Sequence, residues 1–239
     1  MIDRGLKLIS PDRLDQIETD WALVFEPAHV VMRYAEAVQS SLRAFLRCEH
    51  DAEEVAQDFF LWVTQHGLPR ESQDRGRFRD YLKKVVRNQA INYLRNKKPF
   101  TREIGMVDVA SADEVVSLSD QEWLEHWRDC LMTRAWQRLE EYQFHSPKGR
   151  YFTVLHLCVN HPDEDSVQLA ARVRAIDGGI LSAVAFRKQV SRARRVFCKL
   201  LVAEVAKTLD DPSPAEVDEE LAELGLMAYI QDYLPIRRA

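Results

Sequence analysis

Residues 76–98 read "GRFRDYLKKVVRNQAINYLRNKK", a stretch that combines helical periodicity with a high density of lysine and arginine. At about 100° of rotation per residue, one side of the predicted helix collects a stripe of mostly apolar side chains. That side comprises Phe78, Leu82, Val85, Gln89 and Tyr93. We therefore expect a helix over 77–97 with this side buried. The opposite, exposed side is predicted to comprise Lys84, Arg87, Asn88, Ile91 and Arg95, with Tyr81 at its margin.

The exposed side of this helix offers groups that suit nucleic acid. Lysine and arginine bind phosphates, and the Asn88 amide can hydrogen-bond a base edge. Tyr81 could stack on an unpaired base. The alternative is an ordinary solvated face, which is what most charged helix faces are. Asp80 is the only acidic residue between 75 and 102, and this lack of balancing charge favours the nucleic-acid interpretation.

Positive and negative charge are strongly segregated along a chain whose net charge is −5. Residues 70–102 hold eleven lysines and arginines against three acids, and residues 187–199 hold six with no acid. Residues 103–126 and 210–225 each carry seven acids and no lysine or arginine. Two basic segments separated and followed by acidic ones indicate two places that meet a polyanion.

The periodicity is helical nearly throughout, so we predict an all-α fold. The low content of glycine (8) and proline (9) also disfavours an all-β protein with many turns. The acidic stretch 99–119 lacks strong helix signals and is predicted to link two helical domains. The predicted helices cover about 20–47, 51–66, 77–97, 120–143, 149–160, 165–176, 182–209 and 214–231.

A second basic helix is predicted from "SAVAFRKQVSRARRVFCKLL", with Ser182 as its N-cap after a Gly-Gly turn. The segment before it, "DSVQLAARVRAI", predicts a short amphipathic helix capped by Asp165 or Ser166. A short helix, a turn with glycine and a basic helix are typical of a helix-turn-helix, and the alternative is an ordinary helical hairpin. In the first interpretation, residues 183–187 approach base edges and later cations hold phosphates. One side of the basic helix carries Phe186, Val190, Ala193, Phe197 and Leu200, and the other carries Lys188, Arg192, Arg195 and Lys199, flanked by Arg187 and Arg194.

Both basic segments resemble parts of one family. "DAEEVAQDFFLWV" at 51–63 followed by "RGRFRDYLKKVVRNQAINYLRNKK" at 75–98 is similar to region two of the ECF (extracytoplasmic-function) sigma factors. "SVQLAARV" followed by "SAVAFRKQVSRARRVFCKLLVAEVAKTL" resembles their region four. "HGLPRESQDRGRFR" and the tail "DDPSPAEVDEEL" are similar to a planctomycete-like subgroup. The resemblance covers most of residues 25–225.

The resemblance implies a promoter-specificity subunit of bacterial RNA polymerase, not an enzyme. It divides the chain into a region-two-like domain (20–98), an acidic linker (99–119), a region-four-like helix-turn-helix domain (120–209) and an acidic C-terminal extension (210–239). The first domain would contact core polymerase and the single-stranded −10 element, and the second would read the −35 element as duplex. Asn88 matches the base-contacting asparagine of the family, and an unstacked base captured there must be held by hydrogen bonds and stacking.

The resemblance also implies a set of residues for each contact. The polymerase contact would use Asp51, Glu53, Glu54, Gln57 and Asp58. The −10 contact would use Arg77, Arg79, Lys83, Lys84, Arg87, Asn88 and Arg95. The −35 contact would use Ser182, Arg187, Lys188, Ser191, Arg192, Arg195 and Lys199.

Some features depart from the family or leave alternatives open. The turn before "SAVAF" is about five residues longer than the family's tight turn, and the C-terminal extension could cap the second domain, block it or meet another protein. Taken alone, the acids at 51–58 could simply solubilise a helix. A helix-turn-helix regulator without polymerase, or an RNA-binding or scaffold protein with two helical modules, are the rival functions. An anti-sigma or signalling protein is a possible further partner.

Other motifs favour neither catalysis nor a membrane location. The sequence has no P-loop, GxGxxG or HExxH motif, so we expect no enzyme and no cofactor. His156, Cys158 and His161 in "HLCVNH" lack a fourth nearby ligand and match no common zinc spacing, so we expect no metal site. No apolar run approaches the roughly 20 residues that cross a bilayer. We expect a cytoplasmic protein with four reduced, part-buried cysteines.

Overall fold

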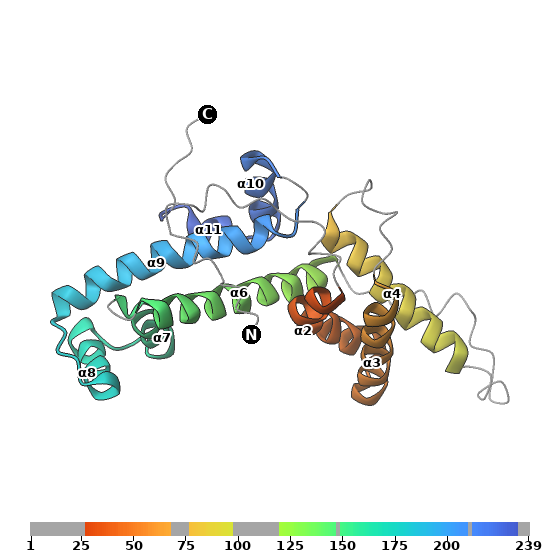
Figure 1. Cartoon of the computed structure of the whole chain (residues 1–239), viewed down its shortest axis with the longest axis horizontal. Coiled ribbons are helices and arrows are strands. Elements are labelled where there is room, and N and C mark those ends of the chain that lie inside the picture. Colours follow the sequence, from red (N-terminus) through yellow and green to blue (C-terminus); the bar gives the residue numbers. More distant parts are fainter. Residues whose placement is uncertain (1–26, 68–76, 98–119, 147–148, 210–211, 234–239) are drawn as a thin grey trace, which may run out of the picture. The chain divides into compact units, whose positions relative to one another are not determined.

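The computed structural model describes residues 27–67, 77–97, 120–146, 149–209 and 212–233, and within these ranges the regular structure is helical, with no strand. This confirms the predicted all-α class (Figure 1). The helices are α2 (Pro27–Leu46), α3 (Glu49–His66), α4 (Phe78–Lys97), α6 (Asp120–His145), α7 (Tyr151–Asn160), α8 (Ser166–Asp177), α9 (Ala183–Ala206), α10 (Pro214–Glu223) and α11 (Met227–Ile230). The predicted start at residue 20 and the predicted linker 99–119 lie outside the described residues.

The predicted helix 214–231 is in fact two helices. Gly225 has a φ of 68°, in the left-handed region that favours glycine. The Leu226 amide donates to the Leu221 carbonyl at 2.8 Å, and the Gly225 amide donates to the Ala222 carbonyl at 3.0 Å. This pair of bonds is the Schellman motif, which ends α10 before α11 begins. The amphipathic pattern continued across the glycine, so periodicity alone did not show the break.

The chain forms two compact units. The N-terminal unit spans Thr19–Leu131 together with Lys207–Ser213, and the C-terminal unit contains Met132–Ala206 and Pro214–Ala239 together with Met1–Glu18. The division therefore falls within α6, and not before residue 120 where the sequence placed the domain boundary. The reason lies in the apolar residues of the first three turns of α6, which pack in the N-terminal unit.

The N-terminal unit is built from α2, α3, α4 and the first part of α6. Trp127 stacks on Tyr34 of α2, with ring centroids 4.9 Å apart and planes 6° from parallel. Phe78 of α4 lies 5.1 Å from Tyr34 between ring centroids. The two tryptophans in the first part of α6, Trp123 and Trp127, are each 1% exposed. Rings of this size bury a large apolar area, which explains why the start of α6 belongs to this unit.

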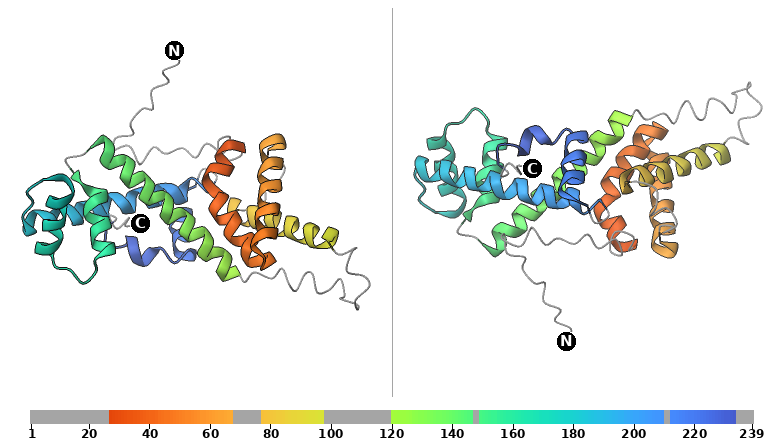
Figure 2. Two further views of the ribbon diagram at one scale, coloured as in Figure 1. Left: turned by 90° about the horizontal axis from the view of Figure 1, so that it is seen from below. Right: turned by 90° about the horizontal axis from the view of Figure 1, so that it is seen from above.

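The C-terminal unit is centred on α9, which packs against α7, α8 and α10 (Figures 1 and 2). Trp136 of α6 and Phe197 of α9 contact each other, with ring centroids 4.9 Å apart. The C-terminal extension is part of this core, because Leu221 and Ile230 are at most 1% exposed. Its packing against α9 supports the first of the three roles considered for the extension, a cap on the domain.

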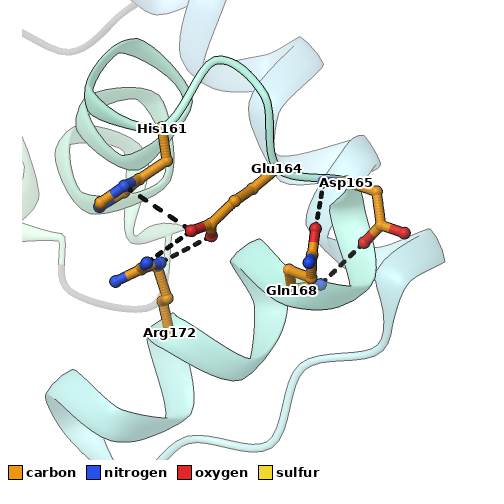
Figure 3. A network of polar contacts seen from close by, with 5 residues as sticks. All are labelled: His161, Glu164, Asp165, Gln168 and Arg172. Atoms are coloured by element: carbon orange, nitrogen blue, oxygen red, sulfur yellow. Dashed lines mark hydrogen bonds and ion pairs between the residues drawn. The ribbon is translucent and has the colours of Figure 1, made fainter.

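Local signals in the sequence determine where α8, the helix that precedes α9 in the chain, begins and ends. Asp165 accepts hydrogen bonds from the amides of Val167 and Gln168, and the Gln168 side chain accepts one from the Asp165 amide. This capping box confirms Asp165, one of the two predicted caps, as the residue that starts α8 (Figure 3). The α8 helix ends at Gly178, whose φ of 72° favours glycine.

An ion pair fastens the start of α8 to the connection before it. Glu164 receives two hydrogen bonds from the Arg172 guanidinium, at 2.6 Å from Nε and 2.5 Å from Nη2 (Figure 3). His161 Nδ1 lies 3.8 Å from the same carboxylate. The hydrogen bond from Arg172 lowers the pKa of Glu164 below its ordinary value.

A second ion pair fastens the end of α8. Arg150 donates from Nε to Asp177 at 2.5 Å. A Cβ atom on Gly179 would lie only 2.0 Å from Arg150 Nη2. With glycine at position 179 the Arg150 side chain can keep this pair without shifting, so the Gly-Gly turn has a packing role as well as a conformational one.

Candidate polymerase and nucleic-acid interfaces

The α4 helix is rotated relative to the sequence prediction. Phe78 and Leu82 are buried as expected, but Val86 and Ala90 complete the buried side in place of Val85 and Gln89, which are half-buried. The α4 helix packs against both α2 and α3, so its buried arc is wider and differently centred than one apolar stripe. Two residues predicted for other roles lie within the buried set.

Ile91 and Arg79 are those two residues. Ile91, predicted on the exposed side, is 7% exposed. Arg79, assigned to the −10 contact, is 2% exposed, and its Nε lies 3.4 Å from Asp80 Oδ1. A guanidinium that is covered in this way cannot reach a phosphate without leaving its site. Arg79 is therefore not part of the exposed surface of α4, because its neighbours in space, and not its residue type, decide its exposure.

The exposed strip of α4 is defined by Lys84, Asn88 and Arg95. All three side chains are exposed, and their positions fall within about 40° of one another around the helix. Lys83 and Arg87 are half-buried beside this strip. An amide placed between two cations can bond a base edge while they hold the flanking phosphates.

The two remaining residues at the start of α4 have partly structural roles. Arg77 is half-buried directly before the helix, and its carbonyl accepts hydrogen bonds from the amides of Asp80 and Tyr81. Tyr81 is half-buried, with its ring centroid 6.3 Å from that of Phe78. Neither residue stands fully exposed, so stacking of a base on Tyr81 would use only the free part of its ring.

The acids predicted for polymerase contact lie on the outer side of α3. Glu53, Glu54, Gln57 and Asp58 are exposed, and Asp51 is half-buried. The buried side of α3, which includes Val55, Phe59 and Val63, faces the other way. Leu61 lies on the outer side as well and is 57% exposed. The sequence prediction missed Leu61, although its spacing of four residues from Gln57 and seven from Glu54 places it on the same face.

Tyr93 connects the two candidate surfaces of this unit. Its hydroxyl lies 3.1 Å from Asp51 Oδ1 and 2.8 Å from Glu54 Oε2. A phenol carries one proton and donates to one acceptor at a time, so the two carboxylates share a single donor. The sequence prediction placed Tyr93 in the buried stripe and gave no sign of this bond between α4 and α3.

The cationic face of α9, which we define as Lys188, Ser191, Arg192, Arg195 and Lys199, is on the surface. The first four are exposed and Lys199 is half-buried. Phe186, Val190 and Phe197 are buried on the opposite side, as the sequence predicted.

The other two residues assigned to the −35 contact support the local structure. Ser182 Oγ accepts a hydrogen bond from the Ala185 amide at 3.2 Å, which confirms Ser182 as the predicted N-cap of α9. Arg187 Nη1 donates to Ser166 Oγ at 2.8 Å and so connects α9 to the first turn of α8. Ser182 therefore stabilises the start of α9, and Arg187 helps to fix the orientation of α9 relative to α8.

The described part of the C-terminal extension contacts the flank of α9. Arg194 Nη1 lies 3.1 Å from the Tyr233 hydroxyl. The Cys198 thiol lies 3.6 Å from the Tyr229 carbonyl, and burial raises its pKa to about 11, so it is protonated at neutral pH. The cysteines are free: Cys130 and Cys198 are buried, Cys158 is half-buried and Cys48 is exposed.

The histidines and the cysteine of the segment 156–161 lie at the C-terminal end of α7 and directly after it. His156 stacks on Phe152 with ring centroids 5.2 Å apart, and His161 faces Glu164. Within the described ranges no three histidine, cysteine or acidic side chains form a group that could hold a metal ion. None of the helices that the structure describes is both long and apolar enough to span a bilayer.

Comparison with known proteins finds a similarity in the N-terminal unit. Residues 30–100 match the family model described as Sigma-70 region 2. The match supports a sigma factor of the sigma-70 family. It covers most of α2 and all of α3 and α4, and with them the exposed strip of α4 and the outer side of α3. No curated protein and no solved structure matches the chain. A region 2 domain implies binding to core RNA polymerase and to promoter DNA in transcription initiation.

Proposed function

We propose that this chain is an ECF-type sigma factor that directs core RNA polymerase to specific promoters and assists their melting in the cytoplasm. The observation that carries the proposal is the match of residues 30–100 to sigma-70 region 2. Within that range the exposed acids of α3 and the exposed Lys84 and Arg95 of α4 have the opposite charges that polymerase docking and DNA binding require.

The first unit would contact both polymerase and the −10 element. The outer side of α3, with Glu53, Glu54, Gln57 and Asp58, would bind a basic surface of the polymerase, and the exposed Leu61 would add apolar contact. On α4, the Asn88 amide would hydrogen-bond an extruded base of the −10 element. The contacts to this base must offset an unstacking cost of a few kcal/mol.

The second unit would hold the −35 element as duplex. Lys188, Arg192 and Arg195 are exposed on one face of α9, the second helix of the α8–α9 pair. Five residues, 178–182, separate the two helices. The caps at Asp165 and Ser182 and the Arg187–Ser166 bond support a defined helix-turn-helix geometry despite this longer turn.

The basic test of the proposal is reconstitution with core polymerase. We expect the chain to co-purify with core enzyme and to direct run-off transcription from promoters selected out of genomic fragments. Failure of both would contradict the sigma-factor proposal. Binding to a palindromic site as a dimer without polymerase would favour a regulator, and preference for structured RNA would favour an RNA-binding protein. The same co-purification from cells would reveal an anti-sigma or signalling partner.

Two variants separate the roles of the units. Asn88→Ala should reduce open-complex formation, while duplex binding by the second unit stays nearly intact. Lys188→Glu with Arg192→Glu should abolish binding to the upstream element, because two attractive charges become repulsive. Permanganate footprinting measures the first step and gel-shift titration the second. Equal loss of the same step in both variants would contradict this division.

A further inference from the structure

Val184 is an exposed apolar side chain at the N-terminal end of the cationic face of α9. It is 54% exposed and lies in the first turn of the helix, one turn before Lys188. Val184, Lys188 and Arg192 fall within about 80° of one another around the helix. The buried side of α9 faces the other way, so packing within the unit does not account for the valine.

The backbone that carries Val184 is held by contacts on both sides of it. Ser182 caps the helix through the Ala185 amide, and Arg187 bonds Ser166 of α8. The preceding turn is fastened where Arg150 bonds Asp177 next to Gly178 and Gly179. A side chain that projects from such a fixed first turn has a defined position, as residues that read a ligand require.

We propose that Val184 reads the 5-methyl group of a thymine in the major groove of the duplex that α9 binds. The thymine methyl is the apolar group that base pairs present in that groove. The first residues of a recognition helix approach base edges, and the cations that follow hold phosphates. Duplex RNA has a deep, narrow major groove that side chains cannot read, so this contact requires duplex DNA. The inference rests on the proposed function and adds a specificity residue to it.

The experiment removes methyl groups from the DNA one at a time. Promoter duplexes selected by the reconstituted holoenzyme are prepared with each upstream thymine replaced by deoxyuridine, which keeps the hydrogen-bonding edge. At one or two positions we expect the replacement to weaken wild-type binding about fourfold, from the loss of one methyl contact. The Val184→Ala holoenzyme should bind the thymine and deoxyuridine duplexes equally at those positions.

Two controls separate this reading from a general effect on structure or charge. Val159→Ala makes the same change at a valine of α7 that is 59% exposed, and it should keep the full sensitivity to deoxyuridine. Val184→Ala should leave the slope of log affinity against log salt unchanged, since valine holds no phosphate. Arg192→Ala should reduce that slope by about one.

The possible outcomes distinguish a failure of this inference from a failure of the proposed function. A holoenzyme that selects promoters but shows no thymine position sensitive to deoxyuridine overturns the inference alone. So does a Val184→Ala variant that keeps the wild-type sensitivity, or a wild-type chain that binds duplex RNA as tightly as duplex DNA. A holoenzyme that selects no promoter overturns the proposed function and this inference with it.

Discussion

At Tyr93 a single phenolic hydroxyl serves two carboxylates of a neighbouring helix. Asp51 and Glu54 lie three residues apart on α3, so both reach the same oxygen. Both acids belong to the set proposed for polymerase contact. A basic surface that engages these carboxylates would compete with Tyr93 for them, so docking on α3 and the position of α4 are linked through one side chain.

Tyr93→Phe should lower the free energy of unfolding of the N-terminal unit by about 1 kcal/mol, because one hydrogen bond to a carboxylate is lost. Urea denaturation of the full chain measures the change. Tyr229→Phe is the matched control, since Tyr229 is 64% exposed on α11, and it should have no effect. An unchanged unfolding midpoint for Tyr93→Phe would show that the bond adds nothing to stability.

At Glu164 the ion pair with Arg172 makes stability depend on pH. The pKa of Glu164 is lowered in the folded chain, so the folded state favours the charged carboxylate. The stabilisation is therefore complete above the ordinary glutamate pKa of 4.5 and is lost as the pH falls through the lowered value.

Glu164→Gln should reduce stability at neutral pH, and the difference from wild type should shrink toward zero as the solution is acidified below about pH 4.5. Urea denaturation from pH 3 to 7 measures this difference. Glu140→Gln, at an exposed glutamate of α6, is the control. A difference that stays constant across the acid range would contradict the assigned ion pair.

Among the elements, α10 and α11 show that the acidic tail is part of a folded core. Their apolar residues Val217, Leu221, Leu224, Leu226 and Ile230 are all buried. Most of the acids that made this segment appear polar, such as Glu216 and Asp218, are exposed, whereas Glu220 is buried. An amphipathic helix with an acidic outer face gives the same composition as a solvated tail, so composition did not distinguish them.

Leu221→Ala should lower the free energy of unfolding of the C-terminal unit by about 2–5 kcal/mol, as expected when a fully buried leucine is truncated. Leu221 is 0% exposed, whereas Leu61, the control for the same substitution, is 57% exposed and should change stability little. Hydrogen exchange of the α9 amides reports the unit directly. Unchanged protection of α9 in Leu221→Ala would contradict a capping role for the extension.

For the whole molecule, the division between units within α6 has a direct consequence. A fragment that ends at residue 119 lacks Trp123 and Trp127, which are almost fully buried in the N-terminal unit. A fragment that ends at residue 131 keeps both. These two fragments test the position of the boundary independently of any DNA or polymerase contact.

We expect the fragment 1–131 to unfold cooperatively and to be at least about 3 kcal/mol more stable than the fragment 1–119, from the cost of losing a buried tryptophan. Circular dichroism during urea denaturation measures both. Trp127→Ala in the full chain should destabilise the same unit. Equal stability of the two fragments would instead support a domain boundary before residue 120.

Much of the fold follows from local signals in the sequence. Most helix ranges and the caps at Ser182 and Asp165 depend on residues within one or two turns of each other. The same holds for the opposite apolar and cationic sides of α9. The segregation of charge is likewise readable without a structure. These features need no knowledge of what packs against each helix, because each is set by neighbours along the chain.

Only the tertiary structure decided the features that depend on which helices pack against each other. Contact with both α2 and α3 rotated the buried arc of α4, covered Arg79 and Ile91, and brought Tyr93 to Asp51 and Glu54. Contact with Tyr34 places Trp127 in the N-terminal unit, and contact with α9 buries the apolar side of α10. A helical wheel shows which side chains share a side, but packing between distant segments decides which sides are covered.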